Sequence, residues 1–277
     1  MKKVNILCTS KPCDGLLYYS YEYCCYLNSI GVTANLIIIT NPKFSEENYC
    51  ESIKEKYTTF ENIIINDIID DNTPILVMGR SMITMAYLDR YDYTMDQRII
   101  LSLLLKNKII AVYSENHGRE YTDALEHFKP KEVIDLCDYD VYPNGVGNKF
   151  EKRIYFDIHK PIHNEIEFDY LFNGSNRSYY ADVIEVIKKY PSHGIMVYNL
   201  EYINNSYNHI LIPVKNLLGK FNTYVYTKSV NDPAPRIIQE CKYHNKNIIF
   251  ENTNVGAETY YKRKLLKPDV GNIINEI

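Results

Sequence analysis

The chain has 277 residues, which is long for one domain and sufficient for two. Its composition, with 45% hydrophobic and 24% charged residues, is typical of a globular protein. A net charge of -4 gives no general attraction to nucleic acid, and no apolar run reaches the roughly 18 residues that a membrane-spanning helix needs. The N-terminal apolar run is too short for a signal peptide. Seven cysteines without a CxxC pair predict reduced thiols in a cytoplasmic protein.

The first half of the chain alternates predicted strands and helices. Val4–Cys8 is a short apolar strand, Leu16–Ser29 has the spacing of a helix that ends at Gly31, and Ala34–Thr40 is the next strand. This order predicts a parallel sheet with helices on both faces. The alternation continues with helices at Glu46–Tyr57 and Met95–Leu105 and strands at Asn62–Ile65, Ile75–Met78, Ile109–Tyr113 and Tyr139–Tyr142.

The second half repeats this pattern after a polar stretch, Lys149–Glu167, which we interpret as the crossover between two domains. We therefore predict an α/β protein with two Rossmann-like doubly wound domains, 1–155 and 156–277. Ligands bind such sheets at the carboxyl ends of the strands. The second domain has predicted strands at Asp169–Phe172, Ile195–Tyr198, Asn222–Tyr226 and Asn247–Phe250, and predicted helices at Tyr179–Tyr190 and, as helix or turn, Val255–Lys267.

The most informative stretch lies between the last two of these strands, where a Pro-rich turn leads into a helix. Asp232 fits the N-cap position, and Pro233 and Pro235 are tolerated at a helix start, where the first N–H groups have no partner in the helix. Free N–H groups, the positive end of the helix and Arg236 would then meet at a spot that suits a phosphate. Asp232 and Glu240 would accept hydrogen bonds from sugar hydroxyls. The alternative interpretation is an ordinary capped helix.

Two loops of the first half are further candidates. Asp14, Gly15 and Leu16 follow the first strand and open a helix, where an anion could approach the backbone, although a plain turn is the alternative. The loop lacks GxGxxG, which argues against a nicotinamide or flavin site. Glu115 and His117 follow a buried strand and are candidates for an acid or base and for a group that positions a hydroxyl or a leaving phosphate. A solvated loop is the alternative there.

Motifs of other enzyme classes are missing from the sequence. There is no HExxH, P-loop or GxSxG motif, so we predict no metal site and no bound cofactor. A small basic cluster near the C-terminus is interpreted as a solvated helix face, with contact to nucleic acid or a membrane as the alternative. Its residues are Lys262, Arg263, Lys264 and Lys267.

Four stretches, taken in order, resemble the retaining GT-B glycosyltransferases that use nucleotide-sugar donors. The chain looks like a short, divergent member of this family, which viruses also encode. The stretches are Asp14-Gly15 after the first strand, Pro143-Asn144-Gly145-Val146 with Phe150 four residues on, Gly174-Ser175-Asn176-Arg177 after the first strand of the second domain, and Asp232 with Glu240, separated by seven residues.

The resemblance implies a role for each matching residue of the second domain. Gly174 would belong to the loop that opens the donor domain, and Arg177 would contact the donor pyrophosphate. Asp232 would hold hydroxyls of the transferred sugar, and Glu240 would hold the ribose. The family's usual lysine after the Gly-Arg loop has no clear counterpart, so Lys228 or Arg236 would supply its charge. Backbone N–H groups would hold phosphate around Pro233, Ala234, Pro235 and Arg236.

The function that the resemblance implies is transfer of a hexose or pentose from a donor such as UDP-glucose to a hydroxyl acceptor, with retention of configuration. The missing metal motif suggests that side chains and helix dipoles, rather than Mg²⁺, stabilise the leaving diphosphate. The first domain would bind the acceptor and the second the donor, on either side of a cleft. The acceptor is either a glycan or a hydroxymethylated pyrimidine in DNA, because small viral GT-B enzymes glycosylate their own DNA. The alternative is a non-catalytic protein that binds nucleotide-sugars or polysaccharides.

Overall fold

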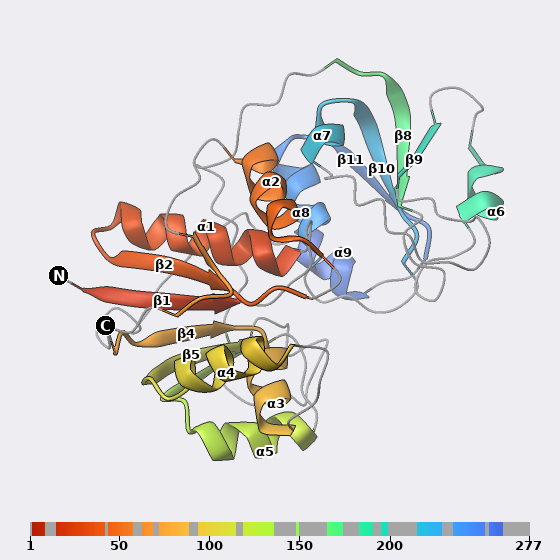
Figure 1. The fold of residues 1–277 in the computed structure, drawn as a ribbon. Coiled ribbons are helices and arrows are strands. Elements are labelled where there is room, and N and C mark those ends of the chain that lie inside the picture. Colours follow the sequence, from red (N-terminus) through yellow and green to blue (C-terminus); the bar gives the residue numbers. More distant parts are fainter. Residues whose placement is uncertain are drawn as a thin grey trace. The chain divides into compact units, whose positions relative to one another are not determined.

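Two parallel sheets covered by helices form the framework of the computed structural model (Figure 1). Contacts within the chain divide it into two compact units, Met1–His159 with Leu266–Ile277, and Lys160–Leu265. The predicted domain boundary, between residues 155 and 156, lies outside the described residues and stays a prediction. The structure describes residues 2–8, 15–41, 44–57, 63–68, 72–88, 94–114, 119–135, 148–149, 165–173, 183–190, 195–198, 215–228, 235–252 and 255–262.

The first unit is built on a sheet whose seven strands, within the described ranges, lie in the order β3-β2-β1-β4-β5-β6-β7. All neighbours pair in parallel, as predicted. The order reverses beside β1, since β2 and β3 are added on one side and β4 on the other. The strands are β1 (Lys3–Cys8), β2 (Thr33–Ile38), β3 (Ile63–Ile65), β4 (Ile75–Met78), β5 (Ile109–Ser114), β6 (Glu132–Asp135) and β7 (Asn148–Lys149).

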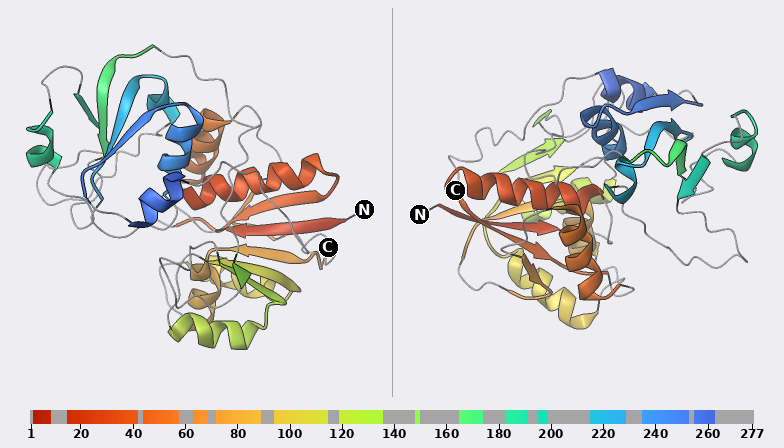
Figure 2. Two further views of the ribbon diagram at one scale, coloured as in Figure 1. Left: turned by 180° about the vertical axis from the view of Figure 1, so that it is seen from behind. Right: turned by 90° about the horizontal axis from the view of Figure 1, so that it is seen from above.

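Helices cover both faces of this sheet (Figure 2). Alternate side chains of each strand point to opposite faces, and apolar side chains on both faces are buried beneath helices. Val4 and Ile6 of β1 pack in the cluster that contains the buried residues of α1 (Gly15–Ser29) and α2 (Glu46–Lys56). Leu7 packs in the opposite cluster. The helices on that side are α3 (Arg80–Leu88), α4 (Met95–Leu104) and α5 (Arg119–Phe128).

The end of α1 confirms the predicted cap at Gly31. Gly31 has φ +86°, in the left-handed region that favours glycine, and its N–H donates to the carbonyl of Asn28 over 3.2 Å. The N–H of Val32 donates to the carbonyl of Leu27 over 3.0 Å, which completes a Schellman motif. The chain is therefore turned sharply into β2.

The second unit has a smaller parallel sheet, with its four described strands in the order β11-β10-β8-β9. This order reverses beside β8, because β9 lies on one side of it and β10 on the other. Buried residues of α7, α8 and α9 pack on one face, and Val186 of α6 packs on the other. The elements are β8 (Phe168–Asn173), α6 (Val183–Ile187), β9 (Ile195–Tyr198), α7 (Lys215–Leu218), β10 (Phe221–Tyr226), α8 (Arg236–Tyr243), β11 (Asn247–Phe250) and α9 (Val255–Lys262).

The predicted α/β class with doubly wound parallel sheets is confirmed, and most predicted strands lie within one or two residues of the observed ones. The prediction missed α3, α5, α7, β6 and β7, and the helix predicted over Tyr179–Tyr190 is described only as Val183–Ile187. The predicted strand Tyr139–Tyr142 lies outside the described residues.

A polar network joins four elements at the carboxyl edge of the first sheet. The amide nitrogen of Gln97 on α4 donates to the carbonyl oxygen of Thr40 over 2.9 Å and lies 3.2 Å from Oδ1 of Asn66. Asn66 donates in turn to the hydroxyl of Thr40 over 2.7 Å and to Glu46 of α2 over 3.0 Å. Gln97 also forms a capping box with Thr94. One side chain thus ties the ends of β2 and β3 to the starts of two helices.

We expect Gln97→Ala to destabilise the first unit by about 2 kcal/mol, because it removes the half of the capping box that accepts from the Thr94 N–H and takes the side-chain donor from the buried carbonyl of Thr40. The measurement is the free energy of unfolding from urea denaturation followed by circular dichroism. Ser102→Ala, at an exposed position of the same helix, is the matched control and should change stability by less than about 0.5 kcal/mol. Equal effects of the two substitutions would contradict the role of the network.

Candidate functional site

The carboxyl edge of the second sheet brings together the starting points of two predicted donor loops. β8 and β10 are neighbours in parallel register, with Phe172 beside Val225. The segments that follow them, 174–182 and 229–234, therefore leave from adjacent strand ends at the point where the strand order reverses. Such a reversal is where doubly wound sheets bind ligands. Gly174, Arg177, Asp232, Pro233 and Ala234 belong to these segments and lie outside the described residues.

The start of α8 differs from the prediction at its cap. The N-cap residue is Pro235, with φ -68° and ψ 113°, and it makes no side-chain hydrogen bond to the helix. The prediction that Asp232 is the N-cap is wrong. Pro235 disfavours helical backbone at the residue before it, so the helix begins only after the second proline. Arg236 is the first residue of the helix, and Asp232 lies outside the described residues.

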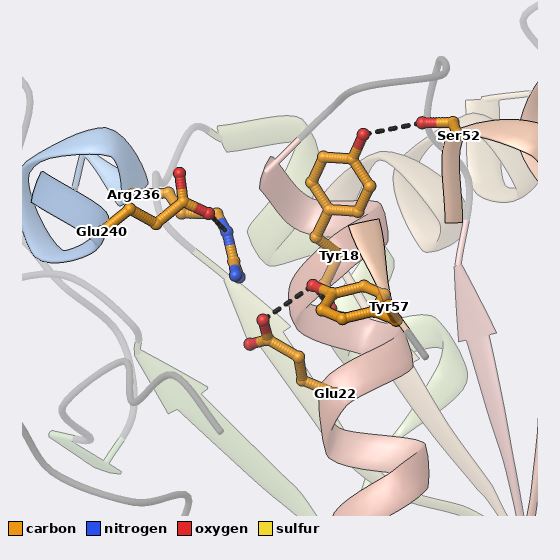
Figure 3. Close-up of polar contacts among 6 residues, drawn as sticks. All are labelled: Tyr18, Glu22, Ser52, Tyr57, Arg236 and Glu240. Atoms are coloured by element: carbon orange, nitrogen blue, oxygen red, sulfur yellow. Dashed lines mark hydrogen bonds and ion pairs between the residues drawn. The ribbon is translucent and has the colours of Figure 1, made fainter. Parts of the chain in front are cut away.

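Arg236 and Glu240 form a buried ion pair one turn apart on α8 (Figure 3). Nε of Arg236 donates to Oε1 of Glu240 over 2.6 Å, and the two side chains are only 7% and 3% exposed. The structure thus joins two residues that the sequence selected separately, one for phosphate and one for ribose.

The end of β10 supplies two further polar groups. Lys228, selected from the sequence, is half-buried just beyond the strand. Thr227 was missed, and its buried hydroxyl has no hydrogen-bond partner among the described residues. Its carbonyl accepts from the side-chain amide of Asn252 over 2.7 Å, which ties the end of β10 to the end of β11. A buried hydroxyl without a partner at this edge fits a place that a bound molecule would satisfy.

Glu251 follows β11 at the same edge and is held by two residues that follow α6. Nζ of Lys189 donates to its carboxylate over 2.7 Å, and the hydroxyl of Tyr190 donates to the other oxygen. These hydrogen bonds lower the pKa of Glu251 below its usual value of 4.5, and the bond from Lys189 has the largest effect. Burial, together with the hydrogen bond to Glu251, raises the pKa of Tyr190.

The first unit carries the other predicted loops at its own carboxyl edge. β1, β4 and β5 are consecutive in the sheet. The segment after β1, which contains Asp14, and the one after β5, which contains Glu115 and His117, therefore start about 10 Å apart. These three residues lie outside the described ranges. Gly15 is the first residue of α1, and Leu16 packs against the core.

A buried carboxylate in α1 was not selected from the sequence. Glu22 is fully buried and accepts a hydrogen bond from the hydroxyl of Tyr57 over 2.7 Å (Figure 3). One turn earlier, Tyr18 and Ser52 share a hydrogen bond of 2.7 Å, and Nζ of Lys56 lies 4.0 Å from the centre of the Tyr18 ring. These contacts fix α1 against α2. The only sequence signal was a single acid within a run of tyrosines.

Within the described ranges, no group of three or more His, Cys, Asp or Glu side chains lies close enough to hold a metal ion. Nor does any described helix combine the length and apolar character that crossing a bilayer requires.

Solved structures of other proteins have a fold similar to that of this chain. No protein-family model and no curated sequence matches the chain. HepE from Anabaena, solved with UDP and glucose and also with UDP-glucose, matches 100% of this chain and 89% of its own at 10% identity, with a TM-score of 0.57. An alpha-glucosyltransferase solved with UDP covers 95% of this chain and 71% of its own at 11% identity, with a TM-score of 0.45. The likeness to HepE and the two parallel sheets confirm the predicted α/β fold of the GT-B class.

We expect Glu251→Gln to destabilise the second unit by about 1 kcal/mol at pH 7, because Lys189 is 62% exposed and solvent screens the pair. Since the pKa of Glu251 is lowered in the folded protein, its contribution is present above the unfolded value and is lost as pH falls through the folded value. The difference in the free energy of unfolding between wild type and variant should therefore stay constant from pH 7 to about pH 5 and shrink below that range. Urea denaturation at several pH values measures it.

Glu185→Gln is the control, because Glu185 and Lys188 form an ion pair in which both side chains are more than half exposed. It should cost less than about 0.5 kcal/mol at every pH. A loss for Glu251→Gln that stays constant down to pH 3 would contradict the assignment of the lowered pKa.

Proposed function

We propose that this protein is a glycosyltransferase that moves a sugar from a nucleotide-diphosphate donor to a hydroxyl acceptor. The observation that carries the proposal is the carboxyl edge of the second sheet. There the adjacent ends of β8 and β10 lead into the predicted donor loops, and α8 begins with a buried arginine paired to a carboxylate. The fold of HepE, whose crystal structures hold UDP-glucose or UDP with glucose, supports UDP-glucose as the donor.

In this proposal the second unit binds the donor. Negative charge develops on the leaving diphosphate, and donors that are fixed before the reaction stabilise it most effectively. Arg177, Lys228, Arg236 and the N–H groups at the start of α8 would serve this purpose. Asp232 would hold hydroxyls of the transferred sugar. The sequence lacks a metal motif, so we assign charge neutralisation to these side chains and to the helix rather than to Mg²⁺.

The first unit would bind the acceptor, with Glu115 and His117 next to the reacting hydroxyl. Retention of configuration is part of the proposal. The acceptor we propose is a glycan hydroxyl, since a chain with a net charge of -4 has no general attraction to DNA. A hydroxymethylated pyrimidine in DNA is the alternative, and binding to it would weaken steeply between low and moderate salt.

UDP-glucose at about 100 times its dissociation constant should add about 2.7 kcal/mol of stability and raise the unfolding temperature by several degrees. A thermal-shift screen against UDP-, GDP-, ADP-, CMP- and TDP-sugars, with Mg²⁺ and with EDTA, measures this. We expect the shift to persist in EDTA. The absence of a shift with every nucleotide-sugar would overturn the proposed function.

Asp232→Ala and His117→Ala should each lower sugar transfer about 100-fold, because each removes a group assigned to the reacting sugar or to the acceptor. Slow hydrolysis of the donor without acceptor provides an assay before the acceptor is known. Glu185→Ala, on the exposed surface of α6, is the control and should leave the rate unchanged. Hydrolysis at the wild-type rate in both site variants would show that the chemistry lies elsewhere.

A further inference from the structure

The outer side of α4 carries apolar side chains that the core of the first unit does not use. The helix (yellow in Figure 1) packs on the sheet through Leu101 and Leu104, which are buried. On its other side, three large apolar side chains follow at intervals of four residues and are 64%, 51% and 41% exposed: Met95, Ile99 and Leu103. Residues four apart lie on one face of a helix, so these three form a continuous apolar stripe. Single exposed apolar residues are common, whereas a row of them marks an interaction surface.

Two lysine turns lie at the amino edge of the same sheet, where α4 ends. Lys106-Asn107-Lys108 leads from α4 to β5, and Lys129-Pro130-Lys131 leads from α5 to β6. The turns are neighbours, because β5 pairs with β6 and the N–H of Lys131 donates to the carbonyl of Ile109 over 3.0 Å. All four lysines are exposed. Glu126 and Glu132 adjoin the second turn, so lysines still outnumber acids, and positive charge gathers at the end of the stripe.

Lys129 holds its charge at a backbone position that suits glycine or asparagine. It has φ +47°, in the left-handed region, and its N–H donates to the carbonyl of Leu125 over 2.8 Å at the end of α5. This backbone is strained for a residue with a Cβ, and helices that end in it usually place Gly or Asn there. Within the part of the chain that the structure describes, Lys129 has no ion pair to offset the strain. Strain of this kind is typical of functional positions.

We propose that the apolar stripe of α4 and the two lysine turns form a surface that docks on an anionic lipid bilayer. The apolar side chains would enter the boundary between headgroups and acyl chains, while the lysines would contact the headgroup phosphates. A nucleic acid would use the lysines but not the stripe. A second copy of the chain would cover the stripe without supplying a cluster of acids, since Asp96 is the only acid of α4. The bilayer is the partner that matches both parts of the surface.

This inference goes beyond the proposed function and does not depend on it. The lysine turns lie at the amino edge of the first sheet, whereas the predicted acceptor loops start at its carboxyl edge. A chain that docks through this surface would therefore keep its carboxyl edge away from the lipid. Vesicle binding and donor binding can consequently be measured separately, and either can fail alone.

The experiment measures co-sedimentation of the full chain with vesicles of phosphatidylcholine, alone or with about one third phosphatidylglycerol. Wild type should bind the anionic vesicles at least about tenfold more tightly than the neutral ones, and salt should weaken this binding. Ile99→Gln should weaken it about tenfold, because an apolar side chain no longer enters the bilayer. Lys106→Gln and Lys129→Asn should each weaken it about fivefold. Lys129→Asn should not lower the free energy of unfolding, because Asn tolerates the left-handed backbone.

The matched controls are Ile30→Gln and Lys54→Gln. Ile30 is 42% exposed just after α1, and Lys54 is exposed on α2, so both lie with the helices of the opposite face of the sheet. Both controls should bind vesicles like wild type. Light scattering after size exclusion tests for a second copy, and fluorescence anisotropy with a DNA duplex tests for nucleic acid.

Absence of vesicle binding by wild type would overturn the proposal, and so would equal binding to neutral and anionic vesicles. Equal losses in the controls and the surface variants would also overturn it. A dimer that Ile99→Gln dissociates would assign the stripe to contact between copies instead. DNA binding that both lysine variants weaken and Ile99→Gln leaves unchanged, without vesicle binding, would assign the lysine turns to nucleic acid.

Discussion

The parallel pairing of β8 with β10 is the interaction on which the candidate site depends. The strand between them in sequence, β9, lies on the other side of β8, so the connections after β8 and β10 leave adjacent strand ends in opposite directions. Divergent connections leave room between them at the carboxyl edge. Strand ends that are distant in sequence therefore lie side by side at one edge of the sheet. β1 and β4 create the same situation in the first unit.

This constraint separates the residues that form the fold from those available for chemistry. The neighbouring strands β8 and β10 bury apolar side chains, and Leu171 and Val225 are fully enclosed. The polar residues collect just beyond the strand ends, where Thr227, Glu251 and Asn252 all lie. Hydrogen bonds from Asn252 and to Glu251 link these ends to their neighbours, so the edge is held by polar contacts rather than by the core. A rigid sheet with a polar edge suits the binding of a charged, hydroxylated ligand.

Much of the fold could be predicted because buried strands of a parallel sheet are short apolar runs between polar turns. The helix α5 was missed because its start adjoins the polar segment that was interpreted as a functional loop. The cap of α8 was predicted wrongly because a single Pro at the first turn is common, whereas Pro235 restricts the residue before it as well. Glu22 could not be found, since its partner Tyr57 is distant in sequence.

The pair on α8 shows what spacing alone can and cannot reveal. The sequence indicates that Arg236 and Glu240 lie four positions apart on a helix, but an exposed pair at this spacing contributes only about 0.3–0.5 kcal/mol. Burial is what distinguishes this pair from an exposed one. The pair is buried because Ile238 and Cys241 of the same helix pack into the core. Local rules are broken where a cation sits at the positive end of a buried helix, and natural proteins break such rules mainly at functional sites.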